Sequence, residues 1–163
     1  MYSLSQDQEI ALSVLHEIIS TRNIQHPTDT ILWILSWSTA LVIQGVNVIP
    51  HDIDILTDKN WSKYLDQLLT NYCIEPSKFS QTEKYKSYFW VYNIQWIKVE
   101  IMGEMQYLQQ DTTWSCANHI HPHVNYMFQG KSYPVLSLEQ ELKEYRAMGR
   151  IETVNQIKKR ISF

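Results

Sequence analysis

Two aspartates one residue apart interrupt an apolar run in the segment His51-Asp52-Ile53-Asp54-Ile55. On an extended strand, alternate side chains point to the same face, so Asp52 and Asp54 are expected to project together while the two isoleucines face the core. Two adjacent carboxylates repel each other unless a cation lies between them. Hard oxygen ligands suit Mg²⁺ or Mn²⁺, with phosphate oxygens completing the shell. The spacing therefore predicts a metal site for phosphoryl or nucleotidyl transfer.

The same pair has a simpler interpretation, because Asp-x-Asp is common at exposed strand ends and in loops, where both carboxylates are solvated. The preceding sequence favours the metal site. Residues Asp29 to Ser36 include a short apolar strand candidate, and Ser38 to Gly45 has the pattern of a helix with a glycine C-cap. Strand, small-residue turn, helix and carboxylate-bearing strand form a phosphate-binding layout, since a helix N-terminus offers unpaired N–H groups.

These features resemble the nucleotidyltransferase superfamily, whose members share the polymerase β-like palm. Its signature is a Gly-Ser or Gly-Gly turn, a helix, an Asp-x-Asp or Asp-x-Glu strand and a third carboxylate on a later strand. Ser38, Asp52 and Asp54 stand at three of these places, and Glu100 stands at the fourth. More closely, the chain resembles small single-domain nucleotidyltransferases with a Val-Glu-Ile-Met-Gly strand, which are distantly similar to the lincosamide and aminoglycoside nucleotidyltransferases.

This likeness runs from about Trp33 to the C-terminus. The matching blocks are Gln44 to Val46, His51 to Asp54, Thr82 to Lys84, Lys98 to Gly103 and Pro134 to Glu139. The resemblance implies an α/β (α+β) fold, with a polymerase β-like palm, a mixed sheet flanked by helices, and C-terminal helices. We expect one domain spanning residues 1–163.

The resemblance also implies a mechanism, in which an acceptor hydroxyl attacks the α-phosphorus of an NTP and pyrophosphate leaves. Asp52 and Asp54 would hold two Mg²⁺ (or Mn²⁺) ions, while Glu100 would complete the acceptor-side ion and act as general base. The turn formed by Trp37, Ser38 and Thr39 would bind the nucleotide's terminal phosphates. The expected partners are an NTP, with ATP first, and an acceptor that the sequence does not identify.

Tryptophan stands where similar proteins would have glycine, at Trp37, Trp61, Trp90 and Trp96. The chain has only 4 glycines but 6 tryptophans in 163 residues, against a usual glycine content of about 7%. We hypothesise that UGA codons, translated as Trp in some genetic codes and as Gly in others, were translated here with the wrong table. The coding DNA tests this, because any other codon at Trp37, Trp90 and Trp96 contradicts it. A tryptophan in the phosphate turn makes the predicted activity conditional on Trp37 being glycine or being tolerated.

Two other functions therefore stay open. One is a catalytically inactive nucleotidyltransferase-fold binding or antitoxin-like module with a partner protein, which an authentic Trp37 favours. The other is a regulatory domain without nucleotide, which requires the arrangement of Asp52, Asp54 and Glu100 to be accidental.

Composition is consistent with a small cytoplasmic enzyme. A net charge of −3 offers no field for gripping a nucleic-acid backbone, so stable nucleic-acid binding is not expected. Cys73 and Cys116 lack CxxC spacing and suggest free thiols in a reducing compartment. The first 25 residues contain no unbroken apolar stretch, so neither a signal peptide nor a membrane partner is expected.

Hydrophobic periodicity and capping residues predict the remaining elements. The expected helices are Ser5 to Arg22, Trp61 to about Tyr72, Ser137 to Gly149 and Ile151 to Ile161; the expected strands are Tyr85 to Ile94, Trp96 to Met102 and, less clearly, Val124 to Phe128. Alternate histidines at His119, His121 and His123 can ligate zinc on a strand, but Pro122 interrupts a regular strand and no fourth ligand is near. A loop at the rim of the site is the alternative for this segment.

Overall fold

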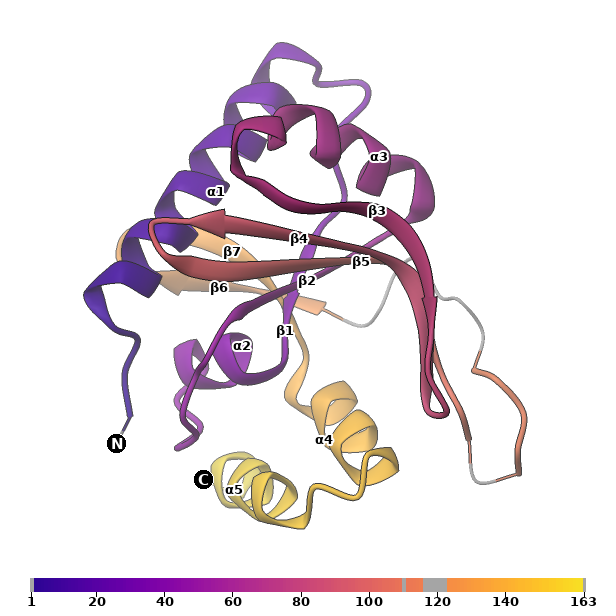
Figure 1. Ribbon diagram of the computed structural model, residues 1–163. Coiled ribbons are helices and arrows are strands. Elements are labelled where there is room, and N and C mark those ends of the chain that lie inside the picture. Colours follow the sequence, from indigo (N-terminus) through magenta and orange to yellow (C-terminus); the bar gives the residue numbers. More distant parts are fainter. Residues whose placement is uncertain (1, 110, 116–122, 163) are drawn as a thin grey trace.

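A seven-stranded mixed sheet organises the computed structural model, which describes residues 2–109, 111–115 and 123–162 (Figure 1). The strands are β1 (Ile34–Ser36), β2 (Ile53–Thr57), β3 (Cys73–Gln81), β4 (Tyr85–Ile94), β5 (Ile97–Tyr107), β6 (His123–Phe128) and β7 (Lys131–Leu136). Their order across the sheet is β3-β4-β5-β2-β1-β7-β6. β2 runs parallel to β5 and β1 runs parallel to β7, whereas the other neighbouring strands are antiparallel.

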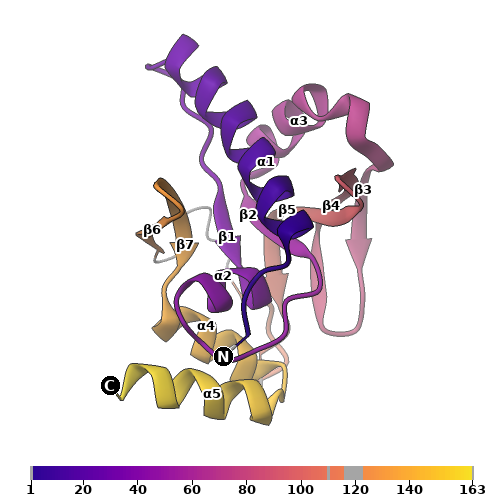
Figure 2. The ribbon, with the colours of Figure 1, turned by 90° about the vertical axis from the view of Figure 1, so that its left-hand side faces the viewer.

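Helices cover both sides of this sheet. They are α1 (Gln6–Gln25), α2 (Trp37–Ile43), α3 (Lys59–Leu68), α4 (Leu138–Ala147) and α5 (Ile151–Ile161), with a short 3-10 helix η1 (Thr70–Tyr72) after α3. Figures 1 and 2 show α1 and α3 above the sheet and α2, α4 and α5 below it. The predicted mixed sheet with flanking and C-terminal helices is thus confirmed. No described helix combines the length and apolar character needed to cross a membrane.

The first helix is fixed by its N-terminal cap and by one apolar face. The Ser5 hydroxyl accepts a hydrogen bond from the Gln8 backbone N–H, and the Gln8 side chain accepts one from the Ser5 N–H, which completes the predicted capping box. Leu12, Leu15 and Ile19 are fully buried in the main core beneath this helix. Burial of each such side chain stabilises the fold by about 1.5–3 kcal/mol.

Side chains along the two central parallel strands, β2 and β5, point alternately into the main core and to the opposite face of the sheet. Ile53 and Ile55 of β2 and Val99 and Ile101 of β5 are fully buried in the main core. The residues between them therefore face the opposite side of the sheet, toward α2 and α4. The predicted inward orientation of the two isoleucines is confirmed.

Some predicted boundaries differ from the structure. β1 occupies only the last three residues, Ile34–Ser36, of the predicted Asp29 to Ser36 segment, and α3 ends at Leu68, with η1 covering the end of the predicted helix. The sequence analysis predicted neither β3 nor β7. Each contains a proline, Pro76 in β3 and Pro134 in β7, and proline argues against a strand unless the strand lies at an edge or its ladder is interrupted. β3 is an edge strand with register shifts, and β7 pairs with β1 only at Leu35 and Val135.

Two of the four tryptophans in question lie on left-handed backbone. The φ angles of Trp37 and Trp96 are 57° and 67°, a region that favours glycine because a Cβ there crowds the following carbonyl. Trp90 has no such backbone, and its fully buried indole leaves Nε1 without a hydrogen-bond partner within the described part of the chain. Trp61 lies in α3. Backbone geometry therefore supports the glycine hypothesis at Trp37 and Trp96 and gives no such support at Trp61 or Trp90.

Candidate active site

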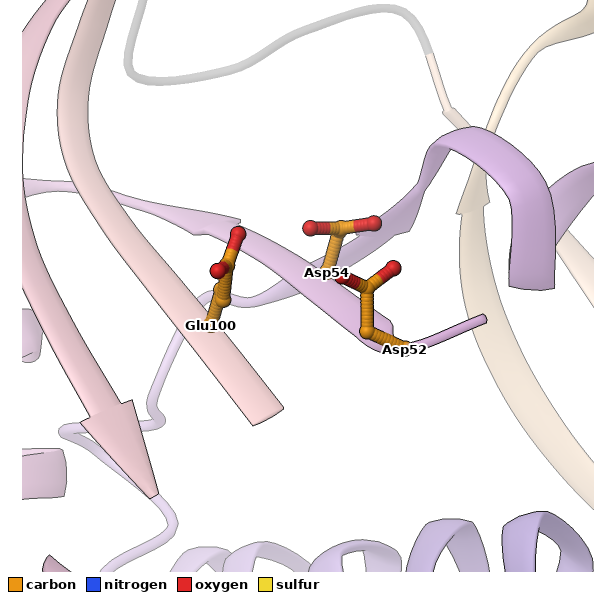
Figure 3. Close-up of side chains that lie close together, drawn as sticks. All are labelled: Asp52, Asp54 and Glu100. Atoms are coloured by element: carbon orange, nitrogen blue, oxygen red, sulfur yellow. The ribbon is translucent and has the colours of Figure 1, made fainter. Parts of the chain in front are cut away.

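Three carboxylates meet where β2 and β5 run side by side. Asp54 and Glu100 are register partners on these strands, and Asp52 lies immediately before β2. One ligand oxygen from each of the three residues lies within 4.8 Å of the others. Figure 3 shows the carboxylates close together, two from the β2 segment and one from β5. The third carboxylate that the resemblance placed on a later strand, Glu100, thus lies beside Asp54, and we call these three side chains the carboxylate cluster.

Asp54 is the most buried carboxylate of this cluster. Its side chain is only 3% exposed. Burial, followed by the negative charges of Asp52 and Glu100, raises its pKa well above the ordinary value. Burial and like charges both disfavour the ionised form, so the arrangement is costly unless a cation neutralises it.

Lys98 already places one positive charge against the cluster. Its ammonium nitrogen lies 2.6 Å from Oε1 of Glu100 and 3.1 Å from Oδ2 of Asp52. The hydrogen bond to Glu100 is the largest influence on the Lys98 pKa, which is raised. Lys98 and Glu100 are two residues apart on one strand and so share a face. The sequence contains this spacing, but the spacing alone did not identify Lys98 as a residue of the site.

The turn that begins α2 is held by two glutamates from α4. The Trp37 backbone N–H donates to Glu141 Oε1 at 2.6 Å, and the Trp37 indole Nε1 donates to Glu144 Oε2 at 3.2 Å. Glu141 is fully buried, and burial, followed by the charge of Glu144, raises its pKa well above the ordinary value. Burial also raises the pKa of Glu144. The first amide of the predicted phosphate turn is thus occupied by a carboxyl group of the protein itself.

The other two residues predicted to bind nucleotide have different surroundings. Ser38 lines the cavity next to the carboxylate cluster. Thr39 is fully buried, and its hydroxyl donates to the Asp52 carbonyl oxygen at 2.6 Å. Thr39 therefore fixes the backbone from which the Asp52 carboxylate projects.

A cavity of about 600 Å³, which we call the main cleft, contains the carboxylate cluster. Trp37 and Ser38 line one part of it, and Tyr145 of α4 lines another. Arg150, Thr153 and Gln156, at the start of α5 and just before it, also line the main cleft. These three residues had no sequence signal, because only the fold-back of α5 brings them to the site. The Arg150 guanidinium carbon lies 5.8 Å from the centre of the Tyr145 ring.

Of the histidine and cysteine candidates, the structure describes His123 and Cys73. His119, His121 and Cys116 lie outside the described residues. His123 is exposed at the start of β6, and Cys73 is an exposed free thiol at the start of β3. Among the described residues, the carboxylate cluster is the group of three acidic, histidine or cysteine side chains that could hold a metal ion.

Comparison with known families agrees with this geometry. The profile of the aminoglycoside-2''-adenylyltransferase family matches residues 22–159. The chain belongs to this family. The match includes the carboxylate cluster, α2 and most of α5. As a member of the aminoglycoside-2''-adenylyltransferase family, the chain is a nucleotidyltransferase, and nucleotide transfer is its class of reaction. No curated protein matches the sequence significantly.

The fold of this chain is similar to the folds of solved nucleotidyltransferase structures. The crystal structure of a candidate nucleotidyltransferase from Thermotoga maritima is similar over 99% of this chain and 97% of its own, with 29% identity and a TM-score of 0.74. ANT(2'')-Ia in complex with adenylyl-2''-tobramycin is similar over 90% of this chain and 86% of its own, with 11% identity and a TM-score of 0.55. The solution structure of ANT(2'')-Ia gives 12% identity and a TM-score of 0.54. The likeness to ANT(2'')-Ia is one of fold.

Proposed function

We propose that this protein transfers a nucleoside monophosphate from an NTP to an acceptor hydroxyl in a reaction that depends on a divalent metal. The observation that carries the proposal is the placement of Asp52, Asp54 and Glu100 within 4.8 Å of one another on the wall of the main cleft. The adenylyltransferase family name supports ATP as the donor. An ATP-consuming reaction of this kind is expected in the cytoplasm, where NTPs are made and used.

The donor set of the carboxylate cluster fits Mg²⁺ or Mn²⁺. All three ligands are carboxylate oxygens, which these hard cations prefer. The raised pKa of buried Asp54 indicates that its ionised form needs a neighbouring positive charge. Lys98 supplies one such charge at Asp52 and Glu100, and a divalent ion would supply two.

Each carboxylate has a proposed role. Asp52 and Asp54 would hold two divalent ions, and Glu100 would complete the acceptor-side ion. When bound, these ions supply charge neutralisation and lower the pKa of the acceptor hydroxyl. The Glu100 side chain is 19% exposed, so it is accessible to receive the proton of the attacking hydroxyl as general base.

The nucleotide would occupy the main cleft. A volume of about 600 Å³ lies within the range of about 300–1,000 Å³ usual for small-molecule sites. Ser38 would contact the terminal phosphates, and Arg150 is a guanidinium in the same cleft that can pair with them. Thr39 would act indirectly, by positioning Asp52. Trp37 would contribute backbone to the phosphate turn only if the Glu141 carboxyl group releases its N–H.

One observation favours the alternative of a catalytically inactive binding or antitoxin-like module. Both the backbone N–H and the indole N–H of Trp37 are engaged by glutamates of α4. A carboxyl group at the first amide of the turn opposes a phosphate at the same place. In this alternative the fold would recruit a partner protein without transferring a nucleotide.

A calorimetric titration with Mg·ATP, Mg·GTP, Mg·CTP and Mg·UTP separates the two functions. The samples are the native chain, Trp37→Gly, and the double variant Asp52→Asn/Asp54→Asn as the matched blank. The proposal predicts binding by the native chain or by the glycine variant, with ATP preferred, and none by the blank. Binding only by Trp37→Gly would mean that the indole obstructs the site. Absence of binding by both would overturn the proposal and favour the inactive module.

A further inference from the structure

A second cavity of about 230 Å³, which we call the side pocket, adjoins the main cleft. Its wall comes from β4 and β5, from the end of β3 and the turn after it, and from Trp37. Trp37 and Glu100 line both cavities. The side pocket therefore reaches the carboxylate cluster at Glu100, the residue proposed to face the acceptor.

Strand register continues the face of Glu100 into the side pocket. Glu100 and Met102 alternate along β5 and project to the same side. Phe89 is the register partner of Met102 on the adjacent strand β4, so its side chain lies on that side too. An aromatic ring resting on Phe89 and Met102 would thus lie one residue pair away from Glu100.

The side pocket is lined mainly by apolar side chains, with several hydroxyl groups among them. Its apolar surface comes from Trp37, Tyr85, Phe89, Met102 and Met105, and its hydroxyl groups come from Ser80, Thr82, Ser87 and Tyr85. Methionine side chains are adaptable and make favourable contacts with aromatic rings. These groups suit a ring or short apolar body that carries a hydroxyl.

Charge in the side pocket argues against a polycationic acceptor. Glu100 is the one carboxylate among the described residues that line it, and Lys86 contributes a positive charge. The Lys86 ammonium lies 4.6 Å from the centre of the Trp114 ring. A molecule with several ammonium groups needs several carboxylates for charge pairing and would be repelled by Lys86.

We propose that the side pocket is the acceptor subsite and that the acceptor is a small aromatic or apolar alcohol or phenol, neutral or anionic. This inference rests on the proposed nucleotidyl transfer and names its substrate class. The volume lies below the range of about 300–1,000 Å³ usual for drug-sized ligands, so the pocket suits a single ring better than an oligosaccharide.

The reaction balances without another reactant. The acceptor oxygen forms a bond to the α-phosphorus, and the bond between this phosphorus and the β-phosphate's bridging oxygen breaks. Pyrophosphate leaves with the electron pair of the broken bond. The hydroxyl proton passes to Glu100 and then to solvent.

Methionine-methyl NMR in the presence of Mg and a non-hydrolysable ATP analogue tests the pocket directly. The probes are 2-(4-hydroxyphenyl)ethanol, 4-hydroxybenzoate and, as the polycation, tobramycin. Met102 and Met105 report on the side pocket, whereas exposed Met127 of β6 is the internal reference. Ser87→Leu fills the pocket and Ser87→Ala is its matched control. Lys86→Glu reverses the charge without filling the pocket.

The expected result is that the two aromatic probes shift the Met102 and Met105 methyl signals and leave Met127 unchanged. Ser87→Leu should weaken the binding of both aromatic probes about ten-fold, and Lys86→Glu should selectively weaken the binding of 4-hydroxybenzoate. Tobramycin shifting the same two methyls more strongly, or aromatic binding unaffected by both Ser87→Leu and Lys86→Glu, would overturn the assignment. Calorimetry with Mg·ATP on the same samples separates failure of the proposed function from failure of the acceptor assignment. If the samples do not bind nucleotide, the proposed function itself is refuted. If they bind nucleotide but the probes do not behave as expected, only the acceptor assignment is refuted.

Discussion

The Lys98 ammonium lies 2.6 Å from Oε1 of Glu100, within the carboxylate cluster. It also contacts Asp52 at 3.1 Å, so a protein cation bridges two of the three proposed metal ligands. A divalent ion that uses the same oxygens must displace Lys98 or share the site with a like charge.

Replacing Lys98 with Met should therefore strengthen Mn²⁺ binding. The Lys98 side chain is half-exposed, and partly exposed ion pairs contribute up to about 1 kcal/mol, so the gain should be up to about five-fold. Electron paramagnetic resonance of free Mn²⁺ measures it. Lys98→Arg keeps the charge and is the control. Equal Mn²⁺ affinity in the native chain and Lys98→Met would show that Lys98 does not compete with the metal.

Asp54 should make the stability of the metal-free protein depend on pH. Its folded-state pKa is raised, chiefly by burial, so above the ordinary carboxyl pKa the folded chain retains a proton that the unfolded chain has released. The contribution of Asp54 to stability is full below its unfolded pKa and is lost as pH rises toward the folded pKa. Asp54→Asn should flatten this fall, whose steepness is at most about 1.4 kcal/mol per pH unit.

Urea unfolding in EDTA at about pH 5 and about pH 8 tests this dependence. Asp7→Asn, on the exposed first turn of α1, is the matched control and should follow the native chain. If Asp54→Asn loses as much stability as the native chain between the two pH values, another group causes the fall.

Thr39 should influence the metal through the Asp52 backbone. Thr39→Val removes the hydroxyl that donates to the Asp52 carbonyl at 2.6 Å. The partly buried carbonyl then lacks this partner, which should lower the free energy of unfolding by about 1–3 kcal/mol and weaken Mn²⁺ binding. Thr39→Ser retains the hydroxyl and should bind Mn²⁺ like the native chain. A Thr39→Val protein that is less stable but binds Mn²⁺ normally would assign Thr39 a purely structural role.

Trp96→Gly should stabilise the protein. Trp96 is 88% exposed and sits with Gln95 in a two-residue turn in which both φ angles are positive. Left-handed backbone costs a non-glycine residue about 1–2 kcal/mol, and the greater unfolded-chain entropy of glycine offsets about 0.4–1 kcal/mol of the gain. Urea unfolding should therefore show a rise of about 0.5–1 kcal/mol. Trp96→Ala, which keeps a Cβ, should show no comparable rise; an equal rise would implicate the indole instead of the backbone.

The Asp52 and Asp54 pair could be predicted because its information is local, whereas Glu100 was predicted from a resemblance. Asp52 and Asp54 are set by a spacing of two on a strand, and a resemblance places Glu100 on the strand that pairs with them. The same reasoning found Ser5 and Ser137 as helix caps, since a cap is defined by residues three positions away. Short-range patterns of this kind can be recognised in the sequence because they do not depend on long-range packing.

Other parts of the site depend on long-range packing and left no local signal. Arg150 enters the main cleft only because α5 folds back below the sheet. The Glu141 bond to the Trp37 backbone N–H joins residues 104 positions apart. β7 was missed because Pro134 is unfavourable in a strand, and only pairing with β6 and contact with β1 define it.

The most direct test of the account is a calorimetric titration of ATP into the native chain with Mg²⁺ and again with EDTA, repeated with Asp54→Asn. Circular dichroism checks that the variant is folded. The account predicts ATP binding that requires Mg²⁺ and disappears in folded Asp54→Asn. Equal ATP affinity in EDTA, or in Asp54→Asn with Mg²⁺, would contradict a metal-dependent nucleotide site at Asp52, Asp54 and Glu100.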